Sequence, residues 1–137
     1  MCWLFWRWRL TRSSSLRHNL RILIDECLPI QLRHIFIGHD ARTVMHMSWR
    51  SLENGELLAA AEREQFDVFV TTDARIPATH DIAGWHLAIV VVPTNRRTIL
   101  DQIASVIIDT VIRAKPGAVS IVSLSNASRR SRRRRTR

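Results

Sequence analysis

Residues 21–29 read Arg-Ile-Leu-Ile-Asp-Glu-Cys-Leu-Pro, a short apolar run that ends on two acidic residues. An apolar run of this length is consistent with a strand buried in a sheet. Proline is tolerated at the first position of a helix, so Pro29 predicts that a helix follows the strand almost at once. The stretch therefore predicts the first strand and helix of an alternating fold, with Asp25 at the carboxyl end of the strand.

The rest of the chain repeats this alternation of strand and helix. Residues 87–93, LAIVVVP, are apolar without interruption, which is typical of a strand buried on both faces of a parallel sheet. The sequence predicts further strands at 41–45, 66–73 and 118–122, helices from about 54 and over 99–113, and a polar loop at 74–85. We therefore expect an α/β fold with a mostly parallel central sheet.

The charge of the chain is divided unevenly between its middle and its two ends. The net charge is +9, yet all twelve acidic residues and only ten of the 21 basic residues lie within 21–122. The excess therefore comes from four arginines in residues 1–20 and seven in residues 123–137. We expect one folded domain over 21–122, a leader over 1–20 that is not part of it, and a disordered arginine-rich tail over 123–137.

The two ends each allow two interpretations. In the leader, interleaved Trp and Arg residues suit a membrane-surface or nucleic-acid-binding segment, but Leu20 directly precedes a strand that could itself begin the protein. The tail could bind nucleic-acid phosphates or be an extension without function. The apolar start of the leader is interrupted by Arg7 and Arg9, too early for a membrane span, so none is expected. Cys2 and Cys27 form no disulfide framework, which favours a reducing, cytoplasmic location.

Acidic residues end two of the predicted apolar strands. Asp25 closes the first strand and Asp73 closes the strand of residues 66–73. Ligands of open parallel sheets bind beyond the carboxyl ends of the strands, so neighbouring strands would bring both carboxylates to one crevice. Two carboxylates in such a crevice repel each other. A hard divalent cation such as Mg²⁺ or Mn²⁺, which prefers oxygen ligands, relieves this repulsion.

The order of several short motifs resembles a known family. ILIDE-x-LP is followed by NGELL, then FDVFVTTD, LAIVVVPTNR and KPGAV, all between residues 21 and 122. In this order and spacing they resemble the PIN-like family, small proteins related to PIN-domain ribonucleases, many of them paired with antitoxins. The resemblance implies a three-layer α/β/α sandwich around a mostly parallel sheet.

The resemblance also implies a metal site and a chemistry. Asp25, Glu56 and Asp73 would be catalytic and would bind Mg²⁺ or Mn²⁺, with Asp81 as a fourth ligand. Arg75 is placed to bind a phosphate oxygen of the substrate, although a solvated loop arginine explains it equally well. Asparagine is usual in the family where this chain has Cys27, which concerns the rim of the pocket more than the metal ligands.

Two functions follow from these expectations. The first is a metal-dependent endoribonuclease, the toxin of a toxin–antitoxin pair, with RNA and an antitoxin protein as partners and a homodimer as one assembly. The alternative is a PIN-like module that binds RNA or a protein without cleaving it, because acidic residues can outlast an activity.

Overall fold

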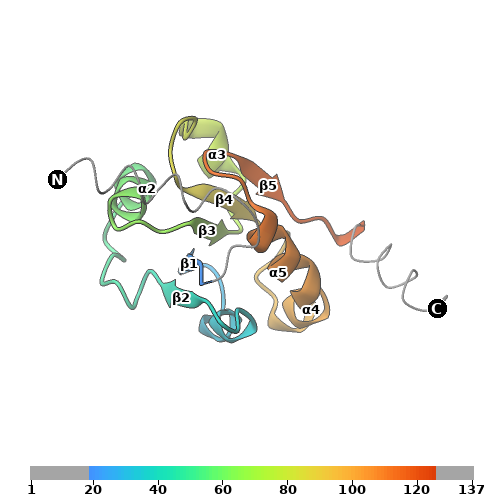
Figure 1. Cartoon of the computed structure of the whole chain (residues 1–137). Coiled ribbons are helices and arrows are strands. Elements are labelled where there is room, and N and C mark those ends of the chain that lie inside the picture. The colour runs from blue at the N-terminus through green and yellow to red at the C-terminus, as the bar shows by residue number, and fades with distance from the viewer. Residues whose placement is uncertain (1–18, 126–137) are drawn as a thin grey trace.

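The structure is a computed structural model that describes residues 19–125. Most of the leader and the arginine-rich part of the tail lie outside the described residues, so the expectations for those segments are not addressed by it. Five strands form one sheet in the order β2-β1-β3-β4-β5, and every neighbouring pair is parallel (Figure 1). The strands are β1 (Arg21–Ile24), β2 (Asp40–Thr43), β3 (Val68–Thr71), β4 (Ala88–Val91) and β5 (Val119–Ile121). The predicted α/β class with a parallel sheet is confirmed.

Helical segments connect the strands. They are the 3-10 helix η1 (Ile30–Ile35) and the α-helices α2 (Asn54–Arg63), α3 (Arg75–Thr79), α4 (Arg97–Gln102) and α5 (Ala104–Arg113). The predicted helices at Pro29 and near residue 54 therefore correspond to η1 and α2, the first of them in 3-10 form. Two other predictions, the loop over residues 74–85 and the single helix over residues 99–113, were wrong.

The predicted loop of residues 74–85 contains the short helix α3. Ile76 is 1% exposed and anchors this turn in the core. Pro77 lies in the first turn of α3, where backbone N–H groups have no partner within the helix, so its missing N–H costs nothing. A polar composition with a proline therefore concealed a helical turn that tertiary burial stabilises.

The single helix predicted for residues 99–113 is divided into α4 and α5. The backbone leaves the helical region at Ile103, which has φ −105° and ψ 11°. Leu100 and Ile107, one on each side of the break, are both buried in the same cluster as Ile103. The break leaves the apolar stripe nearly in phase, so the periodicity of the sequence could not reveal it.

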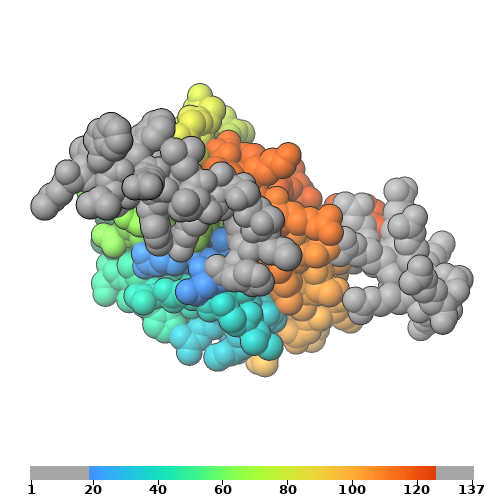
Figure 2. All heavy atoms as spheres, in the orientation of Figure 1, coloured from blue at the N-terminus to red at the C-terminus, as the bar shows by residue number. Residues whose placement is uncertain are grey.

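Two apolar clusters form the core, and alternate residues of each central strand contribute to different clusters. Ile22 and Ile24 of β1 belong to the first cluster and Leu23 belongs to the second, as expected when side chains alternate across a sheet. Helices η1, α4 and α5 contribute to the first cluster, whereas α2 and α3 contribute to the second. In the space-filling view the orange α4–α5 segment lies against the light blue segment that contains η1 (Figure 2).

The direction of strand succession reverses between β1 and β3. From β1 the chain adds β2 on one side, and it then crosses back to add β3, β4 and β5 on the other side (Figure 1). A crevice forms at the carboxyl ends of the strands where such a reversal occurs, and it is the usual ligand site of open α/β sheets. The two strands that flank this reversal are the ones followed by Asp25 and Asp73. No helix within residues 19–125 is long and apolar enough to span a membrane.

Candidate carboxylate site at the ends of β1 and β3

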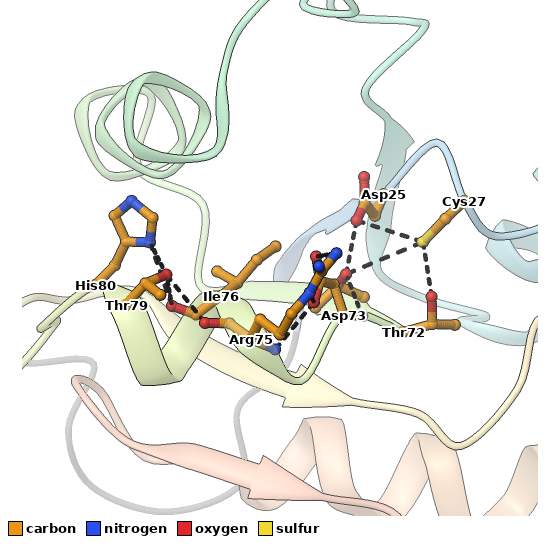
Figure 3. A network of polar contacts seen from close by, with 9 residues as sticks. Asp25, Cys27, Thr72, Asp73, Arg75, Ile76, Thr79 and His80 are labelled. Atoms are coloured by element: carbon orange, nitrogen blue, oxygen red, sulfur yellow. Dashed lines mark hydrogen bonds and ion pairs between the residues drawn. The ribbon is translucent and has the colours of Figure 1, made fainter.

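Asp25 is held at the end of β1 by contacts to both strands of the reversal. Its backbone N–H donates to the carbonyl of Val70 at 3.0 Å, which continues the pairing of β1 with β3. Its Oδ2 accepts a hydrogen bond from the Thr71 hydroxyl at 2.6 Å. The same oxygen accepts from the Cys27 thiol at 3.4 Å (Figure 3). Its Oδ1 accepts from the backbone N–H of Glu26 at 2.8 Å. The orientation of this half-buried carboxylate is therefore fixed by side chains and backbone together.

Thr71, the last residue of β3, connects the two acidic residues. It is fully buried, and its hydroxyl donates to Asp25 while it accepts from the backbone N–H of Asp73 at 3.1 Å. One hydroxyl group thus joins the Asp25 carboxylate to the loop that carries Asp73. The sequence reasoning did not single out Thr71. The available signal was a threonine that continues the apolar run of β3 directly before a second threonine and an acid.

Arg75 donates hydrogen bonds to both carboxylate oxygens of Asp73. The guanidinium donates from Nε to Oδ1 at 3.1 Å and from Nη2 to Oδ2 at 3.3 Å, and the backbone N–H of Arg75 donates to Oδ1 at 2.9 Å (Figure 3). These hydrogen bonds lower the pKa of the Asp73 carboxyl below its usual value. The Arg75 side chain is 88% exposed, so it can leave Asp73 without disturbing the core. The residue expected to bind phosphate therefore lies next to the site and is paired with one of its acids.

Cys27 lies beside Asp25 as a protonated thiol. Burial raises the pKa of the thiol above its ordinary value, and the nearby Asp25 carboxylate raises it further. Thr72 donates a hydrogen bond to Sγ at 3.1 Å, which acts in the opposite direction. A thiol that keeps its proton can donate to Asp25, and it is a poor nucleophile. Cys27 therefore supports the carboxylate instead of acting as a reactive group.

Glu56 and Asp81 make other contacts. Glu56 is exposed in the first turn of α2, where its Oε2 accepts from the backbone N–H of Glu53 at 3.3 Å as part of a capping box. The Oδ1 of Asp81 accepts from the backbone N–H of Ala83 at 2.9 Å. Asp81 also lines a hollow of about 390 Å³ beside β5, which neither Asp25 nor Asp73 lines. The structure thus brings Asp25 and Asp73 to the same reversal and places Glu56 and Asp81 in separate contacts.

The donor set at the ends of β1 and β3 suits a small hard cation. Asp25 and Asp73 offer carboxylate oxygens, and both side chains are only partly buried. Mg²⁺ and Mn²⁺ commonly bind to one or two carboxylates and keep several waters. Among residues 19–125, no group of three or more His, Cys, Asp or Glu side chains lies close enough together to hold a metal ion. Asp25 and Asp73 supply at most two carboxylates, so a cation held by this pair would take its remaining ligands from water.

Comparison with protein-family models, with curated proteins and with solved structures gave no match to this chain.

Proposed function

We propose that this protein is a metal-dependent endoribonuclease of PIN-like type, with a three-layer α/β/α fold, and that it acts in the cytoplasm as the toxin of a toxin–antitoxin pair. The observation that carries the proposal is the pair Asp25 and Asp73, joined through the buried Thr71 hydroxyl at the reversal of strand order. A carboxylate pair at this point of a parallel sheet supports a ligand site. The RNA substrate follows from the resemblance of the motifs around both acids to PIN-like proteins.

In this proposal Asp25 and Asp73 hold Mg²⁺ or Mn²⁺. When bound, such an ion polarises the phosphodiester and lowers the pKa of a water molecule. Thr71 keeps the Asp25 carboxylate in one orientation, since its hydroxyl donates to Oδ2 at 2.6 Å. Arg75 exchanges its partner from Asp73 to a phosphate oxygen of the RNA, and this exchange exposes the Asp73 carboxylate. Glu56 and Asp81 now accept hydrogen bonds from the backbone N–H groups of Glu53 and Ala83. They bind the ion only if their side chains give up these hydrogen bonds.

The test is RNA cleavage by the full-length protein with Mn²⁺ or with EDTA, beside Asp73→Asn and Asp25→Asn. We expect cleavage that requires the metal and falls at least a hundredfold in either variant. Asp101→Asn is the matched control, because Asp101 is an exposed carboxylate on α4 outside the site. Calorimetric titration with Mn²⁺ gives a second readout: binding should weaken in the site variants and persist in the control. Equal cleavage by Asp73→Asn would refute the assignment.

The alternative is a non-catalytic module that binds RNA or a protein. It is favoured by the contacts of Asp73 and Glu56, since Arg75 occupies both Asp73 oxygens and Glu56 caps its own helix. Under this alternative the acids have structural roles. The protein then shows neither Mn²⁺ binding nor cleavage, and Asp73→Asn leaves RNA binding unchanged.

A further inference from the structure

Strand β5 forms one edge of the sheet and exposes apolar side chains there. Val119 is 40% exposed and Ile121 is 67% exposed, and Leu124 just beyond them is 49% exposed. Within residues 19–125, β5 pairs only with β4, so no described strand covers its outer side (Figure 1). An uncovered edge with exposed apolar side chains is a template for pairing with another strand.

The backbone of β5 leaves hydrogen-bonding groups directed outward. The carbonyl of Ala118 accepts from Ile89 of β4, and the N–H of Val122 donates to Val91 of β4. Because successive residues of a strand direct their N–H and C=O groups to opposite sides, the groups of Val119 and Ile121 point away from β4. The outer edge therefore offers two donors and two acceptors in register for an added strand.

The opposite edge of the sheet is protected. Strand β2 carries Asp40 and Arg42, whose side chains form an ion pair at 3.1 Å, and Arg21 of β1 lies 3.6 Å from Asp40. Charged side chains on an edge strand are a common device against unwanted pairing. Within the described part of the chain, β5 itself offers no charged side chain, since residues 116–128 of the sequence contain none.

The sequence that follows β5 indicates the chemistry of a partner. Seven arginines occur within residues 129–137, directly after the uncharged stretch. Acidic residues on a segment that pairs with β5 would be complementary in charge to these arginines, which follow β5 in the sequence. A second copy of this chain is a poorer occupant, because its own β5 segment, within the uncharged residues 116–128, offers no acidic residue to the arginines.

We propose that the outer edge of β5 binds an extended segment of a partner protein, which adds a sixth strand and carries acidic residues complementary in charge to the arginines of residues 129–137. The hollow beside Val119 receives a side chain of the added strand, as in other cases of strand addition. Its walls include Pro77, Ile82 and Ala83. This proposal is independent of the nuclease activity, since it uses the edge of the sheet and none of the acids at the ends of β1 and β3.

The test measures binding of two fluorescent peptides to full-length protein by anisotropy. Each peptide has six alternating Thr and Val residues and six glutamates, placed before the alternating part in one peptide and after it in the other. A peptide of six glutamates alone reports binding to the tail. We expect one of the long peptides to bind at least tenfold more tightly than the short peptide, and Ile121→Lys to remove this advantage.

Ile37→Lys is the matched control, because Ile37 is 88% exposed and lies outside β5. It should leave binding of the long peptide unchanged. Ile121→Pro is a second variant that removes an outward N–H and no hydrogen bond to β4, so the fold should persist, as thermal unfolding can verify. Equal binding of the long and short peptides, or no effect of either Ile121 variant, would overturn the proposal. A dimer that dissociates in Ile121→Lys would also overturn it, by assigning the edge to a second copy.

Discussion

Replacement of Thr71 by valine tests the central contact of the candidate site. Valine has nearly the shape of threonine but lacks the hydroxyl that donates to Asp25 at 2.6 Å and accepts from the Asp73 N–H at 3.1 Å. Because Thr71 is fully buried at the end of β3, no water is expected to take the place of the hydroxyl. The variant therefore removes a polar link between the two acids with little change in packing volume.

The expected loss of stability follows from these contacts. A hydrogen bond to a charged group contributes about 1.5–3 kcal/mol. The Asp73 N–H belongs to a half-buried loop residue and can turn toward solvent once the hydroxyl is gone, so the loss of its hydrogen bond adds little. We expect Thr71→Val to lower the free energy of unfolding by about 2 kcal/mol. For a domain of about 100 residues, where 1 kcal/mol shifts Tm by about 4–8 °C, this lowers Tm by about 8–16 °C.

The assay is thermal and urea unfolding of Thr71→Val beside Thr72→Val. Thr72 is the matched control, because it is half-buried and donates only to the sulfur of Cys27, a weak acceptor. Thr72→Val should cost less than about 1 kcal/mol. If the two variants were equally stable, Thr71 would not be the link between the acids. A double-mutant cycle with Asp25→Asn then measures the coupling directly, and additive effects would also refute the reasoning.

Two further predictions concern the loop after β3 and a turn before β5. Arg75→Gln should raise the pKa of Asp73 toward its ordinary value, since Arg75 donates the hydrogen bonds that lower it; an NMR titration of the carboxyl group measures this. Because the folded pKa is depressed, the stabilisation from this pair is present above the ordinary carboxyl pKa and is lost as pH falls through the folded value, so the two proteins should converge in stability in strong acid. Gly117→Ala should cost at least about 1 kcal/mol more in urea unfolding than Gly38→Ala. Both glycines have positive φ, but an added Cβ at Gly117 would lie 3.2 Å from the carbonyl oxygen of Ile82, whereas at Gly38 it meets nothing within 4 Å. Equal losses of unfolding free energy in the two variants would show that the turn at Gly117 can move to accommodate the added Cβ.

The regular elements were predicted best where local pattern and burial agree. The strand of residues 87–93 and the helix that begins near residue 54 were found from composition alone, because an uninterrupted apolar run and a run of helix formers each favour one structure. Helix α3 was missed because one buried side chain, Ile76, stabilises it, and a single apolar residue has no periodicity. The break at Ile103 was missed because it keeps the apolar stripe on one side.

For the site, the sequence determined which side chains could meet, and the tertiary structure decided which of them do. The sequence alone predicts that Asp25 and Asp73 lie near each other, provided that their strands are neighbours. Acids that follow neighbouring parallel strands lie at the same end of the sheet. That β1 and β3 are neighbours depends on the strand order, which arises from contacts between residues more than 40 positions apart in the sequence. The same long-range contacts place the Thr71 hydroxyl within hydrogen-bonding distance of Asp25 and leave β5 at an edge of the sheet. Local pattern indicates most of the elements, but only their packing decides which side chains lie together and which edge of the sheet stays open.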